Sequence, residues 1–240
     1  MPSFLDVGQV LVKVQKSGIC GSQLGEIDGV KGPDKFLPHL IGHEGFGTII
    51  NIGQGVKHVS PGDNVVLHWR KGAGIQGDPP KYFWRNSPVN AGWVTTFNRH
   101  AVVSENRCTK IPQDLNPDIA ALFGCAITTG FGVVENNAKL KMGETVVIFG
   151  AGGIGLNIIQ AAAMHSASAI IAIDRFNNRL DLAKKLGTTH CINTSQDDAE
   201  NLIKKILRGQ PLDVFIDNTG APKIIELGYR LSQAEGRVIL

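Results

Sequence analysis

The chain reads Thr145-Val-Val-Ile-Phe-Gly150-Ala-Gly-Gly-Ile-Gly155, and a second apolar run, Ala169-Ile-Ile-Ala-Ile, ends at Asp174. The β-branched run before Gly150 is typical of a strand buried on both faces. In this pattern the first glycine allows a tight turn, the second lets backbone approach a pyrophosphate, and the third lets helix and strand pack closely. The helix predicted next directs its free N–H groups at the phosphates. Cofactor contacts are therefore expected from Gly150, Gly152, Gly153, Ile154 and Gly155.

Asp174 indicates which dinucleotide binds at this glycine-rich turn, the dinucleotide cradle. It lies 19 positions after Gly155, where a carboxylate at a strand end accepts hydrogen bonds from the adenosine ribose. Because a carboxylate there repels a 2′-phosphate, we predict NAD. Arg175 and Arg179 leave NADP as the less favoured alternative, and Arg179 is expected in the cofactor site. A glycine turn that binds nothing is the structural alternative.

Composition limits the class of protein. The chain has 240 residues and a net charge of +3, with lysine and arginine scattered along it, so nucleic acid is not an expected partner. No apolar run approaches the roughly 18 residues of a membrane span. The N-terminus lacks the basic and apolar regions of a signal peptide. We therefore expect a cytoplasmic protein that contacts no membrane.

Strand and turn signals divide the chain into a first domain at residues 1–125 and a second at residues 126–240. Residues 9–14, 48–52, 64–67 and 97–103 read as short strands, and residues 17–25 and 38–47 as glycine-rich loops. Many short strands with Gly and Pro between them predict an all-β, barrel-like domain. Residues 70–92 read as a loop-like insert, and residues 118–136 as helical with a break near Gly124.

The second domain alternates strands and helices, which predicts a doubly wound parallel sheet. Strands are expected at 145–149, 169–173, 190–193, 213–217 and 237–240, and helices near 153–165, 177–186, 198–207 and 222–232. Such sheets usually have six strands, and the chain reaches only the fifth. The sequence is therefore interpreted as incomplete.

Four cysteines, none in a CxxC pair, are not expected to form disulfides in a cytosolic chain. Cys20 and Cys125, together with His43, supply the thiolate and imidazole ligands that zinc prefers, and three protein ligands leave a fourth position open. Spacing alone leaves core positions as the alternative. Cys108, and Cys191 in a strand predicted to be central, are expected to be buried small hydrophobes.

The local contexts of these residues are similar to one known family. The matching pieces are Gly18-Ile-Cys20-Gly-Ser22, Gly42-His43-Glu44-Gly-Phe-Gly47, Pro61-Gly-Asp63, Gly124-Cys125-Ala-Ile-Thr-Thr129-Gly130 and the 150–155 fingerprint. In this order and spacing they resemble the zinc-dependent medium-chain alcohol and polyol dehydrogenases. The resemblance implies a GroES-like, barrel-like catalytic domain followed by a Rossmann nucleotide-binding domain, both apparently shortened at the chain ends.

The resemblance also implies roles for individual residues. Cys20, His43 and Cys125 would bind the catalytic zinc, with Glu44 beside the metal. Ser22 would pass the substrate's proton toward solvent, although it can also simply bond its own loop. Thr129 and Gly130 would lie near the nicotinamide. Trp69 would line the substrate pocket, with a core position as its alternative, and Glu44 can also be an ordinary ion-pair partner.

Three departures from the family pattern affect these expectations. Gln23 stands where relatives usually carry an aspartate that orients the histidine ligand. Gln can accept a hydrogen bond from that histidine through its amide oxygen but supplies no charge, so weaker metal affinity is expected. A relay histidine is missing, since positions 24 and 25 are Leu and Gly. Residues 70–92 contain no cysteine, so one catalytic zinc and no structural zinc are expected. A homodimer or homotetramer is expected from the family.

The functional prediction is NAD-dependent interconversion of a primary or secondary alcohol with its aldehyde or ketone. His68, Arg70 and Lys71 favour a polyol, sugar or phosphorylated substrate. One alternative is a zinc-free enoyl or quinone reductase of the same fold. A second is a non-catalytic, nucleotide-binding fragment.

Overall fold

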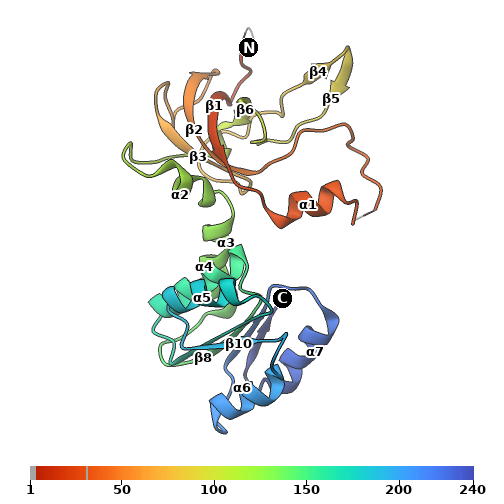
Figure 1. The fold of residues 1–240 in the computed structure, drawn as a ribbon. Coiled ribbons are helices and arrows are strands. Elements are labelled where there is room, and N and C mark those ends of the chain that lie inside the picture. Colours follow the sequence, from red (N-terminus) through yellow and green to blue (C-terminus); the bar gives the residue numbers. More distant parts are fainter. Residues whose placement is uncertain (1–3, 31) are drawn as a thin grey trace. The chain divides into compact units, whose positions relative to one another are not determined.

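The computed structural model describes residues 4–30 and 32–240, drawn as a ribbon in Figure 1. The chain divides into two compact units, Met1–Cys125 and Ala126–Leu240. Each unit has its own sheet and its own apolar core. Within the described ranges, no helix has both the length and the apolar character needed to cross a membrane.

Unit 1 is built on a five-stranded antiparallel sheet with the order β6-β1-β2-β3-β7. The strands are β1 (Gln9–Ser17), β2 (Glu44–Ile52), β3 (Asn64–His68), β6 (His100–Ser104) and β7 (Cys108–Lys110). Val10, Val12 and Val65 face the main core of the unit, which follows from the two-residue repeat of a strand. Phe46 and Val66 pack against helix α2 (Pro117–Leu122).

Several segments of unit 1 differ from the sequence-based expectation. The glycine-rich stretch expected as a loop contains helix α1 (Gly21–Ile27), and β2 begins at Glu44 within the second expected loop. The insert contains a hairpin, β4 (Tyr82–Trp84) and β5 (Ser87–Val89), and a 3₁₀ turn η1 (Glu105–Arg107) precedes β7. The strand expected from residue 97 begins three residues later, at His100.

Unit 2 contains the doubly wound parallel sheet that the sequence predicts, with the order β10-β9-β8-β11-β12. The strands are β8 (Thr145–Phe149), β9 (Ala169–Asp174), β10 (His190–Asn193), β11 (Val214–Asp217) and β12 (Arg237–Ile239). The helical segments are α3 (Ala126–Gly132), the π-helical η2 (Val133–Ala138), α4 (Gly153–Met164), α5 (Asn177–Lys185), α6 (Ala199–Leu207) and α7 (Pro222–Leu231).

Side chains of β8 alternate between two cores, one on each face of this sheet. Val146 and Ile148 join the core that contains residues of α4 and α5. Val147 and Phe149 join the core that contains residues of α6 and α7. This arrangement explains the uninterrupted β-branched run, because neither face of the strand meets water.

The two remaining cysteines have different environments. Cys108 is buried, and burial raises the pKa of its thiol, so the prediction of a small buried hydrophobe is confirmed. The prediction of a central strand for Cys191 is wrong, because β10 lies at the edge of the sheet. Cys191 is half-buried there, with Sγ 3.6 Å from the carbonyl oxygen of Leu180.

Candidate functional site

Three potential metal ligands converge within unit 1. Cys20 immediately precedes α1, His43 immediately precedes β2, and Cys125 follows α2. Although up to 105 positions separate them in the chain, one ligand atom from each residue lies within 4.8 Å of the others. The structure therefore brings together the three side chains that the sequence proposed as metal ligands.

Glycines make room for this convergence. The side chain of Glu44, only 3% exposed, lies so close to Gly18 and Gly124 that a Cβ at either glycine would meet it at 2.6–2.7 Å. These two glycines directly flank the segments that carry Cys20 and Cys125. A larger residue at either position would push its cysteine away from the cluster.

His43 presents one free nitrogen to the cluster. Its Nδ1 lies 2.5 Å from Nε2 of Gln23, whereas its own Nε2 is buried and has no hydrogen-bond partner among the described residues. Burial lowers the pKa of His43 below its usual value, and the charge of Glu26 opposes this shift. A neutral imidazole whose Nε2 is not otherwise engaged can bind a metal ion through that atom when the ring proton lies on Nδ1.

The donor set and its spacing fit one zinc ion. Zn–S bonds of about 2.3 Å and a Zn–N bond of about 2.0 Å place tetrahedral ligand atoms roughly 3.5–3.8 Å apart. Ligand atoms within 4.8 Å of one another reach that spacing through side-chain movements of about 1 Å. Cys20, His43 and Cys125 can therefore hold the metal, with a fourth position left open.

Gln23 ties three residues of this region together. It is 2% exposed, and its Oε1 accepts a hydrogen bond from the backbone N–H of Cys20 at 3.0 Å. Its Nε2 donates to Oγ of Ser22 at 3.3 Å and faces the ring of His43. The sequence suggested that the amide oxygen would face the histidine. In the structure the amide nitrogen does so, because the oxygen is already bonded at the start of α1.

A cavity of about 460 Å³ opens beside Gln23 and His43. Acidic and aromatic side chains contribute to its lining, and the described residues that line it include neither lysine nor arginine. Asp34 and His39, both in the lining, form a 2.7 Å ion pair, and Leu40's carbonyl oxygen and Asp34 raise the pKa of His39 against its burial. The sequence did not predict that Asp34 and His39 line a cavity, because residues 28–40 show no periodic pattern.

Other predicted residues of unit 1 lie in varied surroundings. Ser22 is exposed on α1. Trp69 is 50% exposed rather than in the core, and its carbonyl oxygen accepts a hydrogen bond from Arg107. Neither His68, Arg70 nor Lys71 lines the cavity beside His43.

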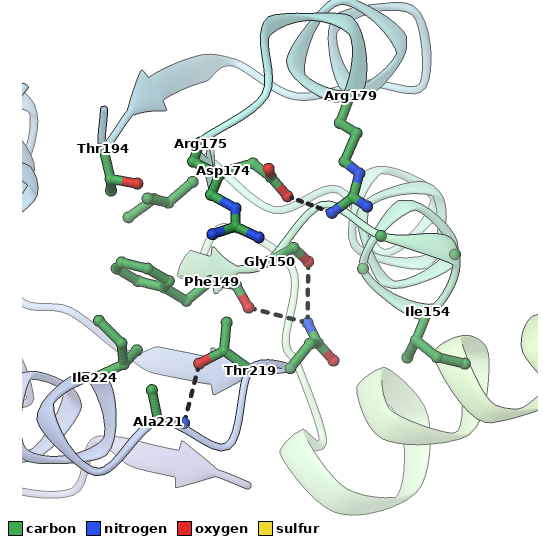
Figure 2. Close-up of a pocket in the computed structure, with 15 residues that line it drawn as sticks. Phe149, Gly150, Ile154, Asp174, Arg175, Arg179, Thr194, Thr219, Ala221 and Ile224 are labelled. Atoms are coloured by element: carbon green, nitrogen blue, oxygen red, sulfur yellow. Dashed lines mark hydrogen bonds and ion pairs between the residues drawn. The ribbon is translucent and has the colours of Figure 1, made fainter. Parts of the chain in front are cut away.

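Unit 2 holds a second cavity, of about 620 Å³, at the carboxyl ends of its strands (Figure 2). The five expected fingerprint residues, 150 and 152–155, all line it. Gly150 has a φ of +93°, and a Cβ on Gly155 would overlap the carbonyl oxygen of Gly150. By contrast, no atom of the residues that the structure describes lies within 4 Å of a Cβ built on Gly152 or Gly153. Space beside these two glycines is what close approach of a pyrophosphate requires.

Asp174 lies at the rim of this cavity and is 6% exposed. Its Oδ2 accepts hydrogen bonds from the backbone N–H of Ala151 at 2.9 Å and from Arg179 at 3.4 Å, and its Oδ1 accepts from Phe176. In Figure 2 a dashed line joins the guanidinium group of Arg179 to this carboxylate, and the guanidinium group of Arg175 appears beside it in this view.

Several lining residues of this cavity were not anticipated. They follow β10 and β11 or begin α7, and parallel strands align their carboxyl ends at one edge, so the strand ends themselves were the available signal. These residues are Thr194, Asn218, Thr219, Ala221 and Ile224.

Thr129 lies in α3 and is half-buried. The next residue, Gly130, packs so closely on Asn157 of α4 that a Cβ there would overlap it. Helix α3 is thus held against the helix that begins at the glycine fingerprint.

Comparisons with known proteins match most of both units to known families. Residues 6–113 match the alcohol dehydrogenase GroES-like domain family, and residues 153–240 match the zinc-binding dehydrogenase family. S-(hydroxymethyl)glutathione dehydrogenase of Photobacterium damsela subsp. piscicida is 33% identical over 216 residues, which cover 80% of this chain and 58% of that protein. The chain spans 58–60% of the length of this and similar curated relatives.

Solved structures show the same fold. Benzyl alcohol dehydrogenase from Acinetobacter calcoaceticus matches with a TM-score of 0.85 and 32% identity, over 98% of this chain and 69% of that one. A quinone oxidoreductase from Pseudomonas syringae pv. Tomato DC3000 matches with a TM-score of 0.81 at 21% identity, over 99% of this chain and 66% of that one, which shows a shared fold alone. The prediction of a GroES-like domain followed by a Rossmann domain is confirmed, and the chain belongs to the zinc-dependent medium-chain alcohol dehydrogenase family.

Proposed function

We propose that this chain supplies the metal site and the dinucleotide cradle of an NAD-dependent alcohol dehydrogenase. The reaction interconverts an alcohol with its aldehyde or ketone by hydride transfer to NAD. The observation that carries this proposal is the convergence of Cys20, His43 and Cys125, whose ligand atoms lie within 4.8 Å of one another. A fold of this kind without metal chemistry has no need to bring together two thiols and an unpaired imidazole nitrogen.

Each part of the site has a chemical task in this proposal. Bound zinc supplies Lewis-acid polarisation of the substrate oxygen. Ser22, exposed two positions after Cys20, is assigned to accept the proton of the substrate hydroxyl and pass it to solvent. Buried Glu44 holds the segments of Cys20 and Cys125 in place through its contacts with Gly18 and Gly124.

The cradle orients the cofactor. Backbone at Gly152 and Gly153 would lie against the pyrophosphate at the start of α4. Thr129 on α3 is assigned to the nicotinamide side. Fixing the nicotinamide makes hydride transfer a nearly unimolecular step. Asp174 would accept hydrogen bonds from the adenosine ribose, and Arg179 is already paired with it, so NAD is assigned over NADP.

The cavity beside His43 favours uncharged alcohols. Among the described residues that line it, no lysine or arginine occurs, and Asp34 is paired with His39, so Glu26 carries the remaining negative charge. An anionic substrate would meet repulsion there. A phosphorylated substrate is therefore disfavoured, and a neutral polyol or aryl alcohol fits the lining better. Trp69 is not among the residues that line this cavity, and its place at the substrate pocket stays a prediction. A homodimer or homotetramer and a cytoplasmic location stay predictions.

Two measurements test the proposal. Metal analysis of the purified protein should find about one zinc per chain, and a screen of neutral alcohols with NAD should reveal NADH formation. Metal-free protein that still reduces quinones or enones would favour the reductase alternative. Protein that binds NADH and zinc but turns over no alcohol would favour the nucleotide-binding fragment.

A further inference from the structure

The side-chain amide of Gln23 lies between the histidine ligand and the start of α1. We propose that Gln23 is a positioning residue that makes metal binding and the hydrogen bond at the start of α1 mutually exclusive, so that the ion is held weakly and exchangeably. The inference rests on the proposed metal site. It concerns the regulation of metal affinity.

The backbone fixes which way the amide faces. The N–H of Cys20 only donates, and the Gln23 atom 3.0 Å from it must therefore be the oxygen. The amide nitrogen then lies 2.5 Å from Nδ1 of His43. Because an amide nitrogen only donates, Nδ1 must accept, and the proton of the neutral ring lies on Nε2.

This tautomer opposes metal binding. Nδ1 is already engaged by Gln23, so the buried, unpaired Nε2 is the atom that can reach a metal ion. A neutral imidazole that binds metal through Nε2 carries its proton on Nδ1. That Nδ1–H would point at the amide N–H group of Gln23, where two donors face each other.

Rotating the amide by half a turn resolves this conflict at the expense of α1. The oxygen then accepts from Nδ1–H, but the amide nitrogen faces the N–H of Cys20, which loses its acceptor. Ser22 tolerates either orientation, because a hydroxyl both donates and accepts. A carboxylate at position 23 would accept from both N–H groups at once, whereas the amide serves only one.

The isosteric variant Gln23→Glu tests the inference first in metal-free protein. Nitrogen-15 NMR of the His43 ring at about pH 8, above the usual histidine pKa, reports its tautomer. The expected result is a proton on Nε2 in the wild type and on Nδ1 in Gln23→Glu. A wild-type ring with its proton on Nδ1 would overturn the inference, and this measurement needs neither the variant nor bound metal.

Zinc affinity provides the second readout, measured by competition with a chelator. Gln23→Glu should bind zinc about 10- to 100-fold more tightly than the wild type, the range usual for groups that orient metal ligands. The control Gln113→Glu makes the same charge change at an exposed position of unit 1 and should leave the affinity unchanged.

The outcomes separate this inference from the proposed function. Equal zinc affinity in the wild type and Gln23→Glu would overturn the role of the amide while leaving the metal site intact. Absence of zinc binding in all three proteins would refute the metal-dependent function. In that case the tautomer of the wild-type ring still decides whether Gln23 positions His43 as described.

Discussion

The cradle of unit 2 and the metal cluster of unit 1 are built from different materials. The part of the cradle expected to hold the pyrophosphate is backbone from one continuous stretch, Gly150 to Gly155, and its shape depends on the absence of side chains at Gly152 and Gly153. The cluster consists of three side chains brought together from distant segments. Nucleotide binding should therefore be most sensitive to substitutions that fill the space beside the backbone. Metal binding should be most sensitive to substitutions that change the chemistry of the ligand side chains.

The largest effect is expected from Cys125→Ser, which replaces a thiolate ligand with a weak one. Loss of Lewis-acid stabilisation worth several kcal/mol should lower alcohol oxidation by about 1000-fold, and bound zinc should fall with it. Metal analysis and NADH formation measure both effects. NADH affinity, which belongs to unit 2, should stay unchanged.

Cys191→Ser is the matched control, because Cys191 is a half-buried cysteine of unit 2 outside the cluster. It should retain zinc and activity. Full zinc content in Cys125→Ser would show that the ligand set is wrong. Metal binding would then not depend on the three converging side chains, and the contrast between the two sites would not hold.

The next effect concerns the cradle and compares two glycines. Gly155→Ala forces a Cβ into the Gly150 carbonyl oxygen and should destabilise unit 2 by about 3 kcal/mol. Gly152→Ala meets no protein atom within 4 Å, so its stability should be preserved while NADH binding weakens. Urea unfolding and NADH titration separate the two. Equal loss of stability in both variants would contradict a cradle shaped by specific backbone space.

A smaller effect is expected at Asp174, the one side chain on which cofactor choice is proposed to depend. Asp174→Asn removes the charge that repels a 2′-phosphate, so the ratio of NADH to NADPH affinity should fall by about 10- to 100-fold, a change of about 1.4–2.7 kcal/mol. Fluorescence titration with both cofactors measures the ratio. Asp181→Asn, an exposed carboxylate on the next helix, should leave it unchanged. An unaltered ratio in Asp174→Asn would move cofactor choice to other residues.

The same contrast explains what could be predicted from the sequence. The glycine fingerprint lies in consecutive residues with a buried strand before it and a helix after it, and Gly150, residues 152–155 and Asp174 all line the expected cavity. The metal ligands could not be recognised from their spacing in the chain. They were predicted only because the sequences around Cys20, His43 and Cys125 resemble those of a known family.

Other features left no local signal. Helix α1 carries Gly21 and Gly25, which disfavour helix. The hydrogen bond that the N–H of Cys20 donates to Oε1 of Gln23 helps its first turn form. The β4–β5 hairpin turns through positive φ at Arg85 and Asn86, without the usual Asn-Gly pair. The edge position of β10 depends on the order of parallel strands, which the sequence order does not reveal.

The smallest effect concerns loops of unit 1 that are held by hydrogen bonds to a side chain rather than by pairing between strands. Buried Glu105 accepts hydrogen bonds from the backbone N–H groups of Lys57, His58 and Ile75 at 2.6–2.7 Å. Desolvation by burial opposes its charged form, but these donors outweigh it and hold the pKa of Glu105 below its usual value. Glu105→Gln retains one acceptor and should lower the free energy of unfolding by about 1.5 kcal/mol at pH 7.

The sign of the pH dependence follows from this lowered pKa. The ionised carboxylate stabilises the folded state fully above its unfolded pKa of about 4.3, and that contribution is lost as the pH falls through the lower folded-state value. The difference in unfolding free energy between wild type and Glu105→Gln should therefore shrink steadily below about pH 4.3. Urea unfolding from pH 7 to pH 3 measures it. A difference that stays constant over this range would show that the charge of Glu105 does not hold these loops, and that unit 1, like the cradle, relies on backbone shape.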